Sequence, residues 1–195
     1  MDRRLFLQSA AAAGISTVAA PSLAAQFAAL TEVSSSVEAV TGARTAIEIE
    51  KAALDELKSS LRGNMLLPGN PGYDVARRVL NPGIDKHPAL VIQPQGVTDI
   101  RKALTFARER ELLLAVKCGG HSYAGKSTCD GGMQIDLSTL RHARVDLPNR
   151  VAHVAGGSLL GELDRESMAV GLVTTAGTVS HTGIGGLTTA GGFGR

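Results

Sequence analysis

Residues 119–127, "GGHSYAGKS", combine several side chains that could do chemistry. Gly120, Gly125, Lys126 and Ser127 fit the phosphate-loop pattern G-x-x-x-x-G-K-[ST], which is typical of nucleoside triphosphate sites. His121 has no role in such a loop, but an imidazole is a good nucleophile and proton carrier near neutral pH. The segment therefore has two interpretations, a triphosphate site or a site whose chemistry depends on the histidine.

The residues after Ser127 argue against a phosphate loop. Such a loop opens a helix whose first backbone amides bind the phosphate. A strand, "LLLAV", does precede the segment, but "TCDGGMQIDL" follows it, with a turn at residues 130–132 and a new strand directly afterwards. No three glycines have the G-x-G-x-x-G spacing of a Rossmann dinucleotide site either.

Two glycine-rich segments remain, residues 119–132 (the first loop) and residues 177–194 (the second loop). Glycine has no Cβ atom, so the backbone amides of such loops can closely approach a flat or anionic ligand. Two loops of this kind predict a long ligand that is held at several points.

The elements around the first loop form a β-α-β pattern. "PALVIQP" predicts a buried strand, and "VTDIRKALTFARER" predicts a helix capped by Thr98 with Ile100, Leu104 and Ala107 on its inner face. "ELLLAVK" is the next expected strand, and it leads directly into the first loop. "MQIDL", after the loop, alternates apolar and polar residues as a strand does.

A hairpin and a helix separate the two loops. "HARVDLPNRVAHVAGG" predicts two short strands that turn at Pro148-Asn149. A helix begins at Ser158, with Leu159, Leu163 and Met168 inward, and ends at Gly171. From residue 174 to residue 195, glycine, threonine and serine dominate and no regular element is expected.

The N-terminal part predicts export and a lead-in. Residues 1–25 contain Arg3-Arg4, an alanine-rich apolar stretch and a small-x-small cleavage site, so a twin-arginine signal peptide is expected. The apolar stretch is too short and too weakly hydrophobic for a stable membrane anchor. Residues 26–83 read as a linker followed by a helix over 45–61, and the main domain is expected over 84–195.

Composition excludes several other functions. The 195 residues have a net charge of +2, 3% aromatic residues and no tryptophan, which gives no footprint for nucleic acid or anionic lipid. Cys118 and Cys129 are expected to be two unpaired thiols rather than a disulfide. His142, His153 and His181 lie on different expected elements with no carboxylate at ligand spacing, so no metal site is expected.

Both loops carry a family resemblance. "VKCGGHSYAGKSTCDGGMQIDLSTL" resembles the first flavin-binding loop of the vanillyl-alcohol oxidase and para-cresol methylhydroxylase (PCMH) superfamily, in its berberine bridge enzyme-like branch. "GTVSHTGIGGLTTAGGFG" resembles the second loop of that family, and "PALVIQPQGVTDI" resembles the start of its FAD-binding domain. The likeness extends from about Leu61 to the last residue.

The resemblance implies an α+β fold: a two-subdomain PCMH-type FAD-binding domain, incomplete at the C-terminus, behind a helical lead-in. His121 would be joined through its imidazole to the methyl carbon of the flavin ring. Val179 stands where many members attach the flavin a second time through cysteine, so a single covalent attachment is implied. The implied FAD-binding residues are Lys117, Cys118, Gly119, Gly120, His121, Ser122, Gly125, Ser127, Gly177, Val179, Thr182, Gly183, Gly185, Gly186, Gly191, Gly192 and Gly194.

Two of these positions, and one beside them, differ from the family's usual binding residues. Lys117 replaces the arginine that is usual in the family, and Ala190, beside the implied set, replaces a glycine. Either change would loosen the grip on the FAD diphosphate without moving it. Cys118 precedes the glycines, at a position that varies in the family, and is expected to pack within the protein rather than contact the ligand.

The implied activity is that of an FAD-dependent oxidoreductase. It would oxidise an alcohol or sugar by hydride transfer to the flavin, which dioxygen or another acceptor would reoxidise. The family usually takes its catalytic base from a substrate domain, which is absent from these residues, so the catalytic residues are unknown. A noncatalytic flavin-binding remnant of a truncated gene is the alternative interpretation.

Overall fold

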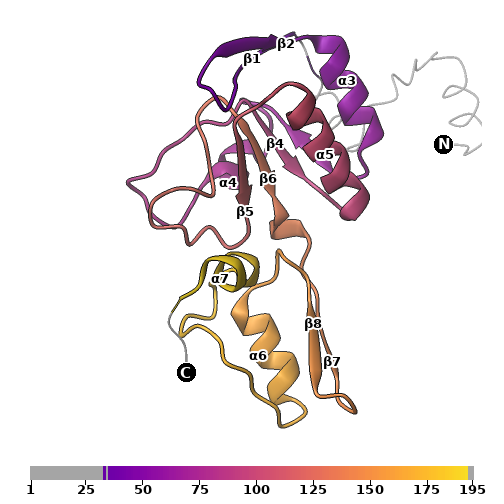
Figure 1. Cartoon of the computed structure of the whole chain (residues 1–195), viewed down its shortest axis with the longest axis vertical. Helices are drawn as coiled ribbons and strands as arrows, with labels where there is room; N and C mark the ends of the chain where they lie inside the picture. Colours follow the sequence, from indigo (N-terminus) through magenta and orange to yellow (C-terminus); the bar gives the residue numbers. More distant parts are fainter. Residues whose placement is uncertain (1–32, 34, 193–195) are drawn as a thin grey trace, which may run out of the picture. The chain divides into compact units, whose positions relative to one another are not determined.

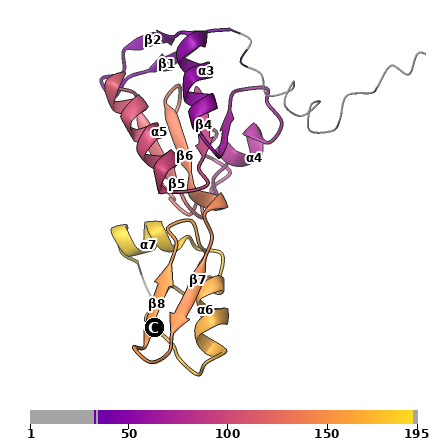
Figure 2. The same ribbon diagram turned by 90° about the vertical axis from the view of Figure 1, so that its right-hand side faces the viewer.

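The fold is described by a computed structural model of the chain, for residues 33 and 35–192. The expected signal peptide over 1–25 and the second-loop residue Gly194 lie outside the described residues. None of the helices within the described ranges is long and apolar enough to cross a membrane. Figures 1 and 2 show the arrangement of the helices and strands in two perpendicular views.

A four-stranded sheet carries the first loop. Its order is β3 (Asn64–Leu66), β4 (Leu90–Gln93), β6 (Met133–Asp136) and β5 (Leu114–Lys117). The strands β4, β6 and β5 are parallel, whereas β3 is antiparallel to β4. The strands expected from "PALVIQP", "ELLLAVK" and "MQIDL" are thus confirmed, but β6 lies between the two strands of the expected β-α-β unit.

Helices pack on both faces of this sheet. On one face, Leu90 and Ile92 of β4 belong to the main core with residues of α3 (Lys51–Ser60) and α5 (Val97–Glu109). On the other face, Val91 packs with Tyr73 and Ala76 of α4 (Tyr73–Arg77). Side chains of a strand point alternately to opposite faces, which explains why three successive apolar residues are all buried. Figure 2 shows α5 and α4 on either side of the sheet.

The N-terminal part differs from the prediction. Residues 37–49 form a hairpin of β1 (Val37–Val40) and β2 (Ala46–Ile49), where a linker and the start of a helix were expected. "AIEI" alternates apolar and charged residues, which is a strand period, and the helix begins only at Lys51. Because Leu54 and Leu57 of α3 join the main core and β3 joins the sheet, this fold begins well before residue 84.

The inner face of α5 is also partly different. Ala103, Phe106 and Ala107 are buried, whereas Leu104 is largely exposed. Gly96 rather than Thr98 occupies the N-cap position, and the buried Asp99 supports this end of the helix. Its carboxylate accepts backbone N–H groups of Arg62, Gly63 and Gln95 at 3.1, 3.0 and 2.9 Å.

The hairpin and helix between the loops are confirmed. β7 (Ala143–Asp146) and β8 (Val151–Val154) pair antiparallel, and α6 (Leu160–Met168) follows. Leu163 is buried and Gly171 has the positive φ of a helix stop, but Met168, expected to be inward, is exposed. A short helix, α7 (Ile184–Ala190), replaces the irregular structure expected in the second loop.

Candidate functional site

The first loop runs between neighbouring parallel strands. It leaves β5 after Lys117 and enters β6 at Met133, and Gly120, Gly125 and Gly131 within it have φ angles of 70°, 67° and 63°. Only glycine adopts such angles without strain, which explains the spacing of glycines in this segment. A strand, not a helix, follows Ser127, and the phosphate-loop interpretation therefore fails.

Lys117 fixes the start of this loop from inside the protein. Its side chain is 8% exposed, and its ammonium group donates to the carbonyl of Ala76 and lies 3.5 Å from a carboxylate oxygen of the buried Asp136. The lysine therefore links β5 to β6 and α4. Its charge is thus paired within the protein, while the residue also lines a smaller cavity together with His121.

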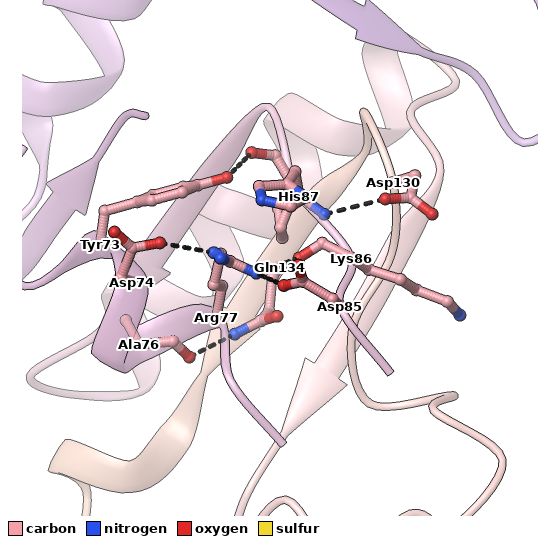
Figure 3. A network of polar contacts seen from close by, with 10 residues as sticks. Tyr73, Asp74, Ala76, Arg77, Asp85, Lys86, His87, Asp130 and Gln134 are labelled. Atoms are coloured by element: carbon pink, nitrogen blue, oxygen red, sulfur yellow. Dashed lines mark hydrogen bonds and ion pairs between the residues drawn. The ribbon is translucent and has the colours of Figure 1, made fainter. Parts of the chain in front are cut away.

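A polar network, drawn in Figure 3, supports the rest of the first loop. Arg77 binds Asp74 at 2.8 Å and Asp85 at 2.5 Å, and its guanidinium donates a hydrogen bond that lowers the pKa of the Asp85 carboxyl. The next residues then reach the loop itself. The backbone N–H of His87 donates to the Asp130 carboxylate at 2.9 Å, and Lys86 donates to the carbonyl of Gly125 at 2.9 Å.

The two loops meet at a pair of glycines. A Cβ atom on Gly119 would lie 2.4 Å from the backbone nitrogen of Gly183, and one on Gly183 would lie 2.3 Å from that of Gly119. Real Cβ atoms do not approach backbone this closely, so neither position accepts a side chain without movement. Gly185 is constrained in the same way by the carbonyl of Gly156, at 2.5 Å. The loops thus contact each other backbone to backbone.

The loops enclose a cavity of about 630 Å³. Eleven of the seventeen expected cofactor residues line it, from both loops: Cys118, Gly119, Gly120, His121, Ser122, Ser127, Thr182, Gly183, Gly185, Gly186 and Gly191. Ligand sites of drug-sized molecules have volumes of roughly 300–1,000 Å³, so this cavity is large enough for part of a dinucleotide.

Five other expected residues do not line this cavity. Lys117 is paired inside, Gly125 packs against Ile84, and Gly192 lies close to the side chain of Leu187. Gly177 and Val179 lie on the second loop but do not form part of the cavity wall.

Six lining residues were not expected from the sequence. They are Val116, Leu137, Gly156, Leu187, Thr189 and Ala190. The Gly156-Gly157 pair was the one available signal, because paired glycines mark close backbone approach, as in the two loops. The others are apolar or small residues whose positions depend on the sheet and on α7.

His121 lies at the boundary of this cavity. Its side chain is half-buried, and burial together with the charge of the neighbouring His181 lowers the pKa of its imidazole. Its Nδ1 atom lies 3.4 Å from the hydroxyl of Thr182. The neutral imidazole, which is the nucleophilic form, is therefore favoured at neutral pH.

The cavity also has the polar features of a cofactor site. The hydroxyl oxygen of Ser127 is enclosed and has no hydrogen-bond partner in the protein, although Ser127 lines the cavity. A buried hydroxyl without a partner is costly, and a bound polar ligand would satisfy it. Together with the backbone surface left open by the glycines, this oxygen fits the FAD that the resemblance implies.

The cysteines do not contribute a disulfide. Cys118 and Cys129 are both free thiols, as expected, and burial raises the pKa of Cys129 to about 11. Cys118 lines the cavity, and its thiol also approaches the carbonyl of Ser158 at 3.5 Å. Within the described ranges, no group of three histidine, cysteine or acidic side chains could hold a metal ion.

Comparisons with known proteins agree with this geometry. The FAD binding domain family matches residues 88–195. An FAD-linked oxidoreductase of Dictyostelium discoideum is 37% identical over 144 residues, which cover 73% of this chain and 31% of that protein. A berberine bridge enzyme-like protein of Nicotiana tabacum is 35% identical over 115 residues, which cover 55% of this chain and 20% of that protein.

Solved structures show the same relationship. The 6-hydroxy-D-nicotine oxidase of Arthrobacter nicotinovorans has a TM-score of 0.64 and 27% identity, covering 66% of this chain and 28% of its own. Phl p 4, a grass pollen allergen with glucose dehydrogenase activity, has a TM-score of 0.65 and 28% identity, covering 72% of this chain and 32% of its own.

The chain spans about 30% of the length of most of these relatives. Its matched part includes both glycine-rich loops and the strands that carry them. The PCMH-type superfamily expected from the sequence is confirmed, together with its mixed helix and strand fold. The chain belongs to the FAD binding domain family of FAD-linked oxidoreductases.

Proposed function

We propose that this chain binds the FAD of an oxidoreductase and attaches it covalently through His121. The observation that carries the proposal is the position of His121, which lines the cavity formed by the two loops. Its imidazole has a lowered pKa and so offers a neutral nitrogen to a ligand in the cavity. The facing second loop has no cysteine at Val179, so the attachment is single.

Residues of both loops contribute to FAD binding, each through different groups. The backbone at Gly186 and Gly191, where nothing lies within 4 Å of a Cβ position, provides a surface without side chains for the flat and anionic parts of the cofactor. Ser127 offers its unpaired hydroxyl to a polar atom. FAD, when bound, supplies the acceptor for the two electrons and the proton that leave the substrate as a hydride.

The substrate is proposed to be a small alcohol or sugar, with dioxygen or another acceptor reoxidising the flavin. The glucose dehydrogenase activity named for Phl p 4 supports this class, whereas the nicotine oxidase shows that relatives of similar fold act on other molecules. Export by the twin-arginine segment at Arg3-Arg4 is part of the same proposal, because this route carries folded proteins that have already bound a cofactor.

The test uses the full-length gene product that contains this chain. After purification it is precipitated with acid, and flavin absorbance is measured in the pellet and in the supernatant. We expect flavin in the pellet for the wild type and in the supernatant for His121→Ala, with His153→Ala as the control histidine variant. Flavin in neither fraction of the wild type would refute FAD binding, and flavin only in the supernatant would refute the covalent bond.

A second measurement tests the substrate class. The purified protein is mixed with a panel of alcohols and sugars without dioxygen, and bleaching of the flavin absorbance near 450 nm is followed. Bleaching by at least one member, and its reversal when air is admitted, is the expected result. A flavin that no alcohol or sugar reduces would refute the proposed substrate class and favour the noncatalytic alternative.

A further inference from the structure

His121 has one close partner that the proposed function does not use. Its Nε2 atom lies 2.5 Å from Nδ1 of His181, and the two ring centroids are 4.5 Å apart with the planes tilted by 47°. The two histidines are separated by 60 positions, on the first and the second loop respectively. At this distance one ring donates a hydrogen bond and the other accepts it, so the two imidazoles share one proton between the facing nitrogens.

The surroundings leave His181 as the available base. Both histidines line a smaller cavity of about 290 Å³, together with the charged residues Lys117 and Arg141. Lys117 is paired with Asp136, and Arg141 donates to Glu162 at 2.9 Å, so both cations are balanced. No carboxylate lines this cavity, and the remaining titratable group is the thiol of Cys118.

The other contact of His121 is compatible with one direction of the shared hydrogen bond. Nδ1 of His121 faces the hydroxyl of Thr182, which can donate to it at 3.4 Å. A lone pair on Nδ1 places the ring proton on Nε2, which then donates to Nδ1 of His181. In this tautomer, His181 carries its own proton on Nε2 and presents a lone pair to His121.

We propose that His181 accepts the Nε2 proton that His121 releases when its imidazole forms the bond to the flavin. This inference rests on the covalent attachment proposed above. The new bond joins an imidazole nitrogen to the ring methyl carbon, and one methyl C–H bond and the imidazole N–H bond break. The two electrons of the C–H bond reduce the flavin, and dioxygen then takes these electrons and two protons to form hydrogen peroxide.

His181 is thus a positioning and proton-accepting residue for cofactor attachment. It holds the imidazole of His121 in one tautomer and removes a proton that would otherwise leave a charged, alkylated ring. This logic is that of a nucleophile paired with a neighbouring base. Burial, the largest cause of the lowered pKa of His121, agrees with it, because His121 must be neutral to act as the nucleophile.

The test measures attachment directly rather than enzyme activity. Full-length apoprotein is made in riboflavin-starved cells and mixed with FAD in air, and acid-stable flavin is followed with time. His181→Ala and His181→Asn are compared with the wild type, and His153→Ala, an exposed histidine on β8, is the matched control. Affinity for FAD before attachment is measured by flavin fluorescence quenching.

A general base contributes typically 100-fold to 10,000-fold, so we expect attachment to slow by about 100-fold or more in His181→Ala. The affinity for unattached FAD should change less than threefold, which separates this role from a structural one. His181→Asn should be similarly slow because an amide is not a base, and added imidazole should accelerate His181→Ala. The wild-type rate should fall on acidification, because a protonated imidazole is neither a nucleophile nor a base.

Wild-type attachment rates in both His181 variants would overturn the proposal while leaving covalent attachment intact. Fast attachment in His181→Asn alone would also overturn it, since the role would then be orientation without proton transfer. Loss of FAD affinity in both variants would show that His181 supports the loop instead. A wild type that never attaches flavin would overturn the covalent attachment and this inference together.

Discussion

The residues of the sheet (64–136, the sheet region) and those that follow it (143–192, the hairpin region) contribute unequally to the core. Leu90, Ile92 and Met133 of the sheet region are completely buried. In the hairpin region the only buried apolar side chains are Leu160 and Leu163, whereas Met168 is 71% exposed and Val173 is 87% exposed. Each region provides one of the two loops of the site, so one loop rests on a dense core and the other does not.

The loops differ accordingly in how they are held. The first loop is fixed by the buried ion pair of Lys117 with Asp136 and, at the surface, by the Asp130 carboxylate, which accepts the backbone N–H of His87. The second loop is held mainly by backbone hydrogen bonds to the start of α6, from Leu160 to Thr182 and from Gly161 to Ser180. A ligand that bridges both loops would therefore mainly suppress opening of the hairpin region, because that region is expected to open more readily than the sheet region.

The largest expected loss of stability comes from a substitution in the core of the sheet region. Ile92→Ala removes a side chain that is fully enclosed in β4 and should lower the free energy of unfolding by about 3–5 kcal/mol. Val151→Ala, on the half-exposed strand β8, should change it by less than about 0.5 kcal/mol. Urea unfolding followed by circular dichroism measures both. Equal losses would mean that the two regions share one core.

Asp99 provides a second, slightly smaller effect in the sheet region. Asp99→Ala leaves three backbone N–H groups without their acceptor and should cost about 2–3 kcal/mol, and Asp99→Asn should cost less. Burial alone would raise the pKa of Asp99, but the hydrogen bonds from Gln95, Arg62 and Gly63 outweigh it, and the pKa lies below its usual value.

The pH dependence of Asp99 follows from that direction. A lowered pKa in the folded state means that the stabilisation is complete above the unfolded value of about 3.9 and is lost as the pH falls through the folded value. The stability difference between wild type and Asp99→Asn should therefore be full at pH 7 and should shrink in urea titrations near pH 3. A constant difference at both pH values would contradict the carboxylate as the acceptor.

The sequence predicted the parts of the molecule that depend on local patterns. The strands β4, β5 and β6, the hairpin and both loops were found because turn residues and apolar runs mark them. The strand β2 was missed because "AIEIE" fits a strand as well as the start of a helix, and only pairing with β1 decides. The helix α7 was missed because glycine and threonine favour it weakly, so tertiary contacts determine it.

Prediction of the site had similar limits. The glycines and His121 were identified because their residue types are unusual at that spacing, and most of them line one cavity. The partnership of His121 with His181 was not predicted, since residues 60 positions apart meet only through the folding of both loops. The inward direction of Lys117 was missed for the same reason, because its partner Asp136 lies on the neighbouring strand.

The contact between the two regions is tested by a matched pair of glycines. Gly183→Ala places a methyl group about 2.3 Å from the Gly119 backbone, so the loops must separate and the affinity for FAD should fall at least 10-fold, or about 1.4 kcal/mol. Gly96→Ala, at the start of α5 and outside both loops, meets nothing within 4 Å and should bind FAD as the wild type does. Titration of the apoprotein with FAD measures both, and equal affinities would remove the loop contact from the site.

The smallest effect compares two thiols of the sheet region, one buried in it and one at its contact with the second loop, and it requires no change in stability. Cys129 is buried in the sheet region with a pKa raised to about 11 by burial, so its reactive thiolate is scarce at pH 7.5. Cys118 is only half-buried and lines the cavity beside Gly183, where opening of the second loop would expose it.

We therefore expect a thiol reagent to label Cys118 first and Cys129 only when the sheet region unfolds, with Cys118→Ser and Cys129→Ser identifying each phase. Bound FAD should slow the labelling of Cys118 and leave that of Cys129 unchanged. Because labelling of a protected thiol reports the opening that exposes it, the ratio of the two rates measures how much less stable the hairpin region is. Simultaneous labelling would show that both regions open as one unit, and the contrast between their cores would then have no dynamic consequence.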